Sequence, residues 1–335
     1  VPVSAGIIVG AIGSGIIGII GYRCIHILNR IGTWVLGIST VVGFIYILSH
    51  IHTGDFLTRG EFNLSGWLAT VSLAALWQIA FAPYVSDYSR YLPADVPVAA
   101  TFWATYLGST LGSSLAFIFG AVAVLATPVG TDTMDAVSLA CGALGPFMLL
   151  LFLLSVISHN ALNLYGAVLS IITLVQTFAW RWIPTGKSRA ALSVVVLILC
   201  SIAAIGTSKD FIGHFVDLVL ALLVVLVPWT AINLIDFYLI HRGKYDIASI
   251  FRVDGGIYGY YNPHALIAYA VGIAVQIPFM NTPIYTGPVS HYINGADLSW
   301  LVGMLVTSPL YYWLASRDSA YRRQTSGTLH GAVRE

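Results

Sequence analysis

The run FIGHFVDLVLALLVVLVPWTAINLIDFYLI at residues 211–240 decides the class of fold. It contains two acidic residues, Asp217 and Asp236, and no Lys or Arg. A helix needs about 20 mostly apolar residues to cross the hydrocarbon core of a bilayer. This stretch is long enough and apolar enough, so it predicts a membrane-spanning helix.

The rest of the chain has the same character. Hydrophobic residues make up 58% of the 335 residues and charged residues 9%, whereas roughly a quarter of a soluble domain is charged. So few charges cannot cover a water-exposed surface. We therefore expect an all-α polytopic membrane protein. The nine predicted spans are residues 3–22, 32–50, 65–86, 101–126, 146–170, 190–206, 211–240, 263–281 and 297–315. A short helix packed on the outer face is expected at 132–144.

The Lys and Arg residues predict the orientation of these spans, because positive charge collects on the cytoplasmic side. With the C-terminus inside, the inner segments hold thirteen of the 15 Lys and Arg residues, and the outer loops hold only Arg59 and Lys209. We expect a plasma (inner) membrane protein with a cytoplasmic C-terminus. Nine spans then place Val1 outside without a targeting segment, so we expect that upstream helices are missing.

Composition and motifs exclude other classes of function. A net charge of +1 gives no reason to expect a nucleic acid partner. No P-loop, dinucleotide fingerprint or nucleophile–His–acid set is present, so neither an enzyme nor a cofactor is expected. The three cysteines lack metal-site spacing, and no obligate protein partner is evident.

The third predicted span is interrupted by a proline. Pro83 has no N–H and cannot bond the carbonyl of Ile79. Unwound backbone inside a membrane is tolerated where it lines a cavity, and transporters use such breaks to bind substrates. We expect unwinding between about Trp77 and Pro83. The alternative is a simple proline kink, with Asp87 at the cytoplasmic rim.

The fifth predicted span carries a dense polar stripe of Ser155, Ser158, His159, Asn160 and Asn163. Residues four apart lie on one helix face, and polar groups at this depth should face protein or a cavity. Two interpretations stay open, a cavity lining and hydrogen bonds between helices. His159 favours the cavity, because an imidazole can carry a proton near neutral pH.

The seventh predicted span has its own proline. Pro228 frees the carbonyl of Val224, and Thr230, Asn233 and Asp236 share a face at spacing i, i+3, i+6. A mobile gating helix needs such a hinge. The alternative is a structural kink, with Asp236 near the inner headgroups.

Four segments resemble motifs of the nucleobase:cation symporter-1 family, in particular its purine–cytosine permease branch. They are GYRCIHILNRIG at 21–32, APYVSDYSRYLP at 82–93, HNALNLYGAVLSI at 159–171 and WTAINLIDFYLIHRGKYDI at 229–247. The resemblance implies a twelve-helix LeuT-like fold with a five-plus-five inverted repeat. The nine spans would be family helices four to twelve, and an N-terminal truncation would account for the first three.

The resemblance also implies a domain organisation. Residues 1–335 would form one transmembrane transporter domain, and spans two and seven would act as thin gates. Its parts would be the end of the first repeat at 1–52, the second inverted repeat at 65–242, two C-terminal helices at 263–316 and a cytoplasmic tail at 317–335.

For the substrate, the resemblance implies aromatic rings that sandwich a planar heterocycle and amides that bind its edges. Trp77 or Phe81 would supply the ring from the third span, with Gln78 as an amide partner. Asn160 and Asn163 would be the amides of the fifth span.

For the cation, the resemblance places the coupling positions at Ser155, Ser158 and His159. Sodium-coupled members use hydroxyls here, so a Na⁺ site at Ser155 and Ser158 is one expectation. Imidazole is a poor sodium ligand beside oxygens, so His159 favours H⁺.

These observations predict a secondary active symporter. It would import a nucleobase such as cytosine or a purine, or a related heterocycle, with H⁺ or Na⁺ by alternating access. The alternative is a LeuT-fold transporter for another solute, such as allantoin, a hydantoin, a thiamine precursor, an amino acid or an amine. A channel or an intramembrane enzyme would show pore rings or a paired nucleophile and base, and neither is visible.

Overall fold

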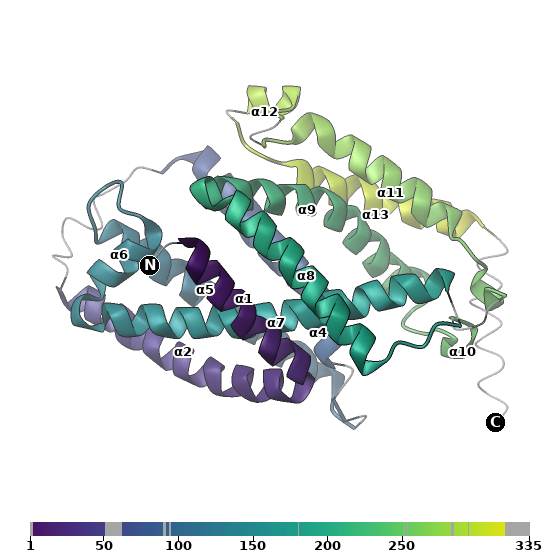
Figure 1. Cartoon of the computed structure of the whole chain (residues 1–335). Coiled ribbons are helices and arrows are strands. Elements are labelled where there is room, and N and C mark those ends of the chain that lie inside the picture. The colour runs from purple at the N-terminus through teal and green to yellow at the C-terminus, as the bar shows by residue number, and fades with distance from the viewer. Residues whose placement is uncertain are drawn as a thin grey trace. The chain divides into compact units, whose positions relative to one another are not determined.

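The computed structural model describes residues 3–50, 62–89, 92–93, 95–179, 181–250, 252, 254–282, 285–293 and 295–318. These residues are predominantly helical, and their one β feature is an isolated bridge between Asn281 and Thr286. The helices are α1 Val3–Ile20, α2 Tyr22–His50, α4 Leu64–Ser89, α5 Val98–Leu125, α6 Thr133–Ala140, α7 Gly145–Phe178, α8 Gly186–Gly206, α9 Phe211–Ile235, α10 Ile247–Ile250, α11 Pro263–Gln276, α12 Pro288–Tyr292 and α13 Ser299–Arg317 (Figure 1).

Within this described part, seven helices are long and apolar enough to cross a membrane. They correspond to the first seven predicted spans. The eighth span is a shorter apolar helix, Pro263–Phe279, and the ninth is α13. The all-α polytopic class is therefore confirmed, with seven clear spans where nine were expected. The predicted tail lies outside the described residues beyond Asp318.

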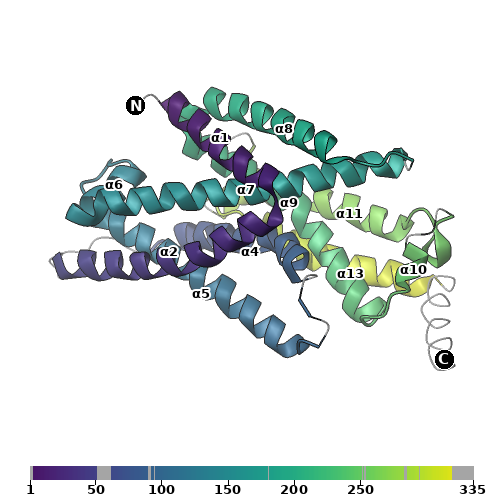
Figure 2. The same cartoon turned by 60° about the horizontal axis from the view of Figure 1, so that its bottom comes forward.

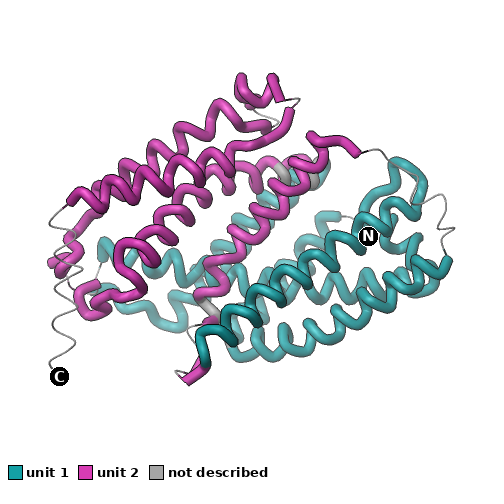
Figure 3. The backbone as a smooth tube through the Cα atoms, turned by 180° about the vertical axis from the view of Figure 1, so that it is seen from behind, with its two compact units in different colours: residues 1–61, 97–211 teal, residues 62–96, 212–335 magenta. Residues whose placement is uncertain are grey.

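The chain divides into two compact units (Figure 3). Unit 1 comprises Val1–Glu61 and Pro97–Phe211, and unit 2 comprises Phe62–Val96 and Ile212–Glu335. Unit 1 therefore holds α1, α2 and α5 to α8, and unit 2 holds α4 and α9 to α13. The predicted single domain with its inverted repeat stays a prediction.

In unit 1, α7 is the central helix and contacts α1, α2, α6 and α8, as Figures 1 and 2 show. Small residues bring α1 close to it. A Cβ on Gly18 would lie 3.1 Å from Leu164 Cδ2, and the Ser14 hydroxyl donates to the carbonyl of Ile157 at 3.1 Å. Such close contact is how membrane helices associate when water provides no driving force.

The chain connects α1 and α2 differently from the prediction. An inner loop was expected between residues 22 and 32, but the helix α2 already begins at Tyr22. The only break is Gly21, at φ 107°, a conformation that glycine adopts without steric cost. Hydropathy detects the apolar part of a helix and cannot detect its polar continuation past Arg23 and Arg30.

The short helix expected at 132–144 is present as α6. Asp132 caps it by accepting a hydrogen bond from the backbone N–H of Met134 at 3.1 Å. It packs against α5 and α7. Val137 and the C-cap residue Cys141 join a buried core with Ile47, Phe119 and others, so the short helix belongs to the core of unit 1.

In unit 2, α11 and α13 lie side by side (Figures 1 and 2). Buried Ala268 and Tyr311 pack there against Ile232 and Ile235 of α9. A second apolar cluster joins α4 to α9 through residues that include Leu76, Leu223 and Val227. The predicted gate helix α9 and the helix with the predicted aromatic residues, α4, thus belong to one packed unit.

Candidate functional site

The helix α4 carries the predicted aromatic and amide residues without a break. It is helical from Leu64 to Ser89, with Pro83 inside it. The predicted unwinding between Trp77 and Pro83 is therefore wrong. A proline removes one donor from the ladder and usually bends a helix rather than ending it, and Pro83 lies at an exposed position. The predicted position of Asp87 concerns a side chain outside the described part.

The aromatic candidates on α4 are accessible within this chain. Trp77 is 53% exposed and Phe81 is 38% exposed, and Gln78 is also exposed. Phe81 stacks on Tyr84 with ring centroids 6.1 Å apart. An exposed ring can offer a flat face to a planar partner. This arrangement allows the predicted stacking role, which stays a prediction.

The helix α7 brings Ser155 and His159 together one turn apart. His159 Nδ1 lies 2.8 Å from the carbonyl oxygen of Ser155 and 3.4 Å from its hydroxyl. A carbonyl only accepts hydrogen bonds, so Nδ1 carries the hydrogen in this contact. Nε2 is then the acceptor nitrogen of the neutral ring. The imidazole is exposed in this chain.

Ser158 faces a different neighbour from Ser155. It is 8% exposed, and its hydroxyl donates to Oδ1 of Asn29 on α2 at 2.7 Å. This is the hydrogen bond between helices that the sequence left open as an alternative. Asn160 and Asn163 are exposed on α7. The polar stripe thus divides into a helix–helix contact and an accessible face.

The helix α9 contains Pro228 in a continuous helical segment. Asn233 is exposed and its amide donates to the carbonyl of Trp229 at 2.8 Å. The hydroxyl oxygen of Thr230 is buried, with no hydrogen-bond partner among the described residues. Pro228, Thr230 and Asn233 therefore have different environments. Their predicted gating or hinge role, shared with Pro83 of α4, stays a prediction.

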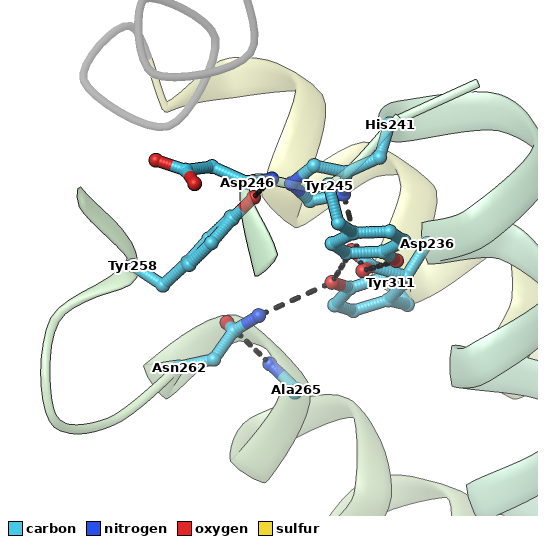
Figure 4. A network of polar contacts seen from close by, with 8 residues as sticks. All are labelled: Asp236, His241, Tyr245, Asp246, Tyr258, Asn262, Ala265 and Tyr311. Atoms are coloured by element: carbon cyan, nitrogen blue, oxygen red, sulfur yellow. Dashed lines mark hydrogen bonds and ion pairs between the residues drawn. The ribbon is translucent and has the colours of Figure 1, made fainter. Parts of the chain in front are cut away.

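The end of α9 forms a polar cluster that the sequence did not predict. Asp236 starts a π-helical segment, Asp236–Ile240, a feature often found at functional sites. Its carboxylate accepts hydrogen bonds from the hydroxyls of Tyr245, at 2.6 Å, and Tyr311. The Nδ1 atom of His241 lies 3.1 Å away, and Asn262 donates to the Tyr311 hydroxyl at 3.2 Å (Figure 4).

This Asp236 cluster, defined as Asp236, His241, Tyr245, Asn262 and Tyr311, connects α9, the following loop, α11 and α13. Burial raises the pKa of Tyr245, and its hydrogen bond to Asp236 adds to the rise. The phenol therefore stays a donor across the physiological pH range. The sequence placed Asp236 on one face with Thr230 and Asn233 or, in the alternative, near the inner headgroups, and it predicted none of the partners seen here.

The loop after the cluster is ordered by a second carboxylate. Asp246 accepts from the backbone N–H of Ala248 and the hydroxyl of Ser249, and its own N–H donates to the Tyr258 hydroxyl at 2.8 Å. The bond from Ser249 holds the pKa of Asp246 below its usual value. Among the described residues, no three His, Cys, Asp or Glu side chains gather as a metal site would require.

Comparison with known proteins bears on the whole chain. A family model described as "Permease for cytosine/purines, uracil, thiamine, allantoin" matches residues 3–303. YxlA of Bacillus subtilis (strain 168), named as a purine-cytosine permease, is 35% identical over 300 residues, which cover 88% of this chain and 65% of the relative. The purine-cytosine permease fcyB of Emericella nidulans is 24% identical over 340 residues, covering 94% and 63%.

The chain thus spans a little under two thirds of the length of these curated relatives. No solved structure matches it significantly. The family model covers nearly all of the helices described above, including α4, α7 and α9 with the candidate residues. The chain therefore belongs to the family of permeases for cytosine and purines, uracil, thiamine and allantoin.

Proposed function

We propose that the protein is a symporter that imports a nucleobase, such as cytosine or a purine, by alternating access. The observation that carries this proposal is the match of the permease family to residues 3–303. The 35% identity to a relative named as a purine-cytosine permease supports the substrate class. The LeuT-like inverted repeat, the plasma membrane location and the cytoplasmic C-terminus belong to the same proposal.

The proposed substrate contacts are the aromatic and amide residues of α4 and α7. Trp77 or Phe81 of α4 would stack on the heterocycle, and Gln78, Asn160 and Asn163 would bind its polar edge. Their exposure within this chain supports these roles. A planar ring buries a large apolar area against an aromatic side chain, while amides can pair with both the donors and the acceptors of a base.

The proposed coupling ion is H⁺, taken up at Nε2 of His159. The hydrogen bond of Nδ1 to the carbonyl of Ser155 supports this, because it fixes the neutral tautomer that can accept a proton. Na⁺ at Ser155 and Ser158 is the alternative. It is less favoured because the third coupling position is His159, and an imidazole is a poor sodium ligand beside oxygens.

The function is tested by uptake competition in cells that express the protein in full. Labelled cytosine is expected to accumulate, and unlabelled adenine, hypoxanthine or uracil should reduce uptake in proportion to their affinities. Allantoin, a hydantoin and a thiamine precursor test the related heterocycles. Competition by an amino acid or an amine, with none by the heterocycles, would exclude the nucleobase proposal.

A substitution on α4 tests the stacking role. Trp77→Ala or Phe81→Ala should weaken substrate binding about tenfold, because stacking contributes about 0.5–1.5 kcal/mol beyond the area that the ring buries. The affinity is measured as half-saturation of cytosine uptake. Trp103→Ala on α5 is the control, since Trp103 is similarly exposed at 54% and has no proposed substrate contact. Unchanged affinity in both α4 variants would place the pocket elsewhere.

A further inference from the structure

The proline of α9 leaves one backbone carbonyl without its usual donor. Pro228 lacks an N–H, so the carbonyl oxygen of Val224 cannot make the i→i−4 bond of a regular helix. Pro228 is among the most deeply buried residues of the described chain. At a membrane depth with no water, an unpaired carbonyl is costly. The carbonyl therefore needs a donor from another helix.

Gln276 of α11 provides this donor. Its Nε2 donates to the carbonyl of Val224 at 2.9 Å and to the carbonyl of Gly272, one turn back on α11, at 2.9 Å. The two amide hydrogens are thus both used. Gln276 is 0% exposed, so its side-chain amide is buried between the helices and does not reach solvent.

Close packing holds the amide in place. A Cβ on Gly272 would lie 2.2 Å from Oγ1 of Thr307 and 2.9 Å from Cβ of Pro228. A Cβ on Gly303 would lie 2.6 Å from Cδ of Gln276. All three distances are shorter than real Cβ contacts, so a side chain at either glycine position would displace Thr307, Pro228 or the amide of Gln276. The α11–α13 pair therefore packs around Pro228 of α9 and around the amide of Gln276 that donates to Val224.

We propose that Gln276 is a positioning residue for transport, acting as the substitute backbone donor at the Pro228 hinge. It stabilises the carbonyl that the proline frees and thereby connects the conformation of α9 to α11 and α13. This inference rests on the proposed function, in which α9 is a gate. It differs from a packing role, because a packing role depends on the volume of Gln276 and not on its amide.

A double-mutant cycle separates the two roles. In Gln276→Met the side chain keeps its length and loses its donor, so the unfolding equilibrium constant should rise about tenfold, because the buried carbonyl is left without a partner. In Pro228→Ala the N–H of residue 228 returns and can bond Val224. In that background, Gln276→Met should have an effect at least about fivefold smaller.

The cycle is measured by reversible unfolding in mixed detergent micelles, without substrate. Ser158→Ala is the matched control, because it removes another buried hydrogen bond between helices but lies in unit 1. Its effect should be the same in the wild-type protein and in the Pro228→Ala background. Equal effects of Gln276→Met in the two backgrounds would overturn the substitute-donor inference.

A second measurement tests the effect on α9 itself. Amide hydrogen exchange along residues 217–235, again without substrate, should accelerate in Gln276→Met, and Pro228→Ala should suppress that acceleration. Cytosine uptake by Gln276→Met should show a maximal rate at least about threefold lower, with half-saturation nearly unchanged. A wild-type rate would overturn the positioning role. If the wild-type protein transports no heterocycle, the proposed function fails, but the cycle and the exchange data still decide whether Gln276 is the donor.

Discussion

Asp236→Asn is expected to lower the free energy of unfolding by about 3 kcal/mol, the low end of the range for breaking a buried pair. The carboxylate accepts from Tyr245 and Tyr311 and lies 3.1 Å from His241. Its side chain is 17% exposed and that of His241 is 2% exposed. An amide removes the negative charge and presents N–H groups to these donors. At least one buried donor then loses its partner.

The effect is measured as the shift in the unfolding midpoint of the purified protein in detergent. Asp254→Asn is the matched control. Asp254 is bonded to Arg252 at 2.6 Å, and this bond lowers the pKa of Asp254 to about 2. Both side chains are about 60% exposed, and exposed ion pairs contribute little to stability. The control should therefore leave the midpoint nearly unchanged. An equal shift in the two variants would show that the Asp236 cluster contributes no more than a surface pair.

His159→Asn is expected to abolish proton-driven uptake while exchange of substrate across the membrane continues. A proton symporter needs a group that binds H⁺ on one side and releases it on the other, and an imidazole titrates near neutral pH. Asparagine retains a hydrogen-bonding side chain but cannot be protonated. Exchange of substrate for substrate, which moves no net protons, should therefore continue.

Proteoliposomes with an inward proton gradient and no sodium gradient test this expectation. The wild-type protein should accumulate cytosine, His159→Asn should not, and counterflow should persist in both. His291→Asn is the control, because His291 is an exposed histidine of α12 with no proposed role. Uptake that requires sodium and ignores a protonophore would contradict proton coupling. Ser155 and Ser158 would then become the expected sodium ligands.

The sequence by itself determined the class of protein and most of its helices. A bilayer is a uniform apolar solvent, so a spanning helix is marked by local composition alone, and the apolar runs found α1, α2, α4, α5, α7, α8 and α9. The motifs that resemble the family are local as well, and the family that they indicated is confirmed by the match over residues 3–303. The predicted short helix at 132–144 followed from the same kind of signal.

Tertiary structure decided the partners of the polar groups. The hydrogen bond of Gln276 to Val224 joins residues 52 positions apart in the sequence. The bonds of Tyr311 to Asp236 and of Ser158 to Asn29 join residues 75 and 129 positions apart. A serine or an aspartate within an apolar run can face a cavity or a neighbouring helix, and the sequence pattern is the same in both cases. The same ambiguity made the predicted unwinding at Pro83 wrong. A proline shows that one backbone N–H is missing, but it does not show whether the helix unwinds there. Which group replaces that donor depends on the helices packed around it, and for Pro228 only the packing of α11 and α13 decided it.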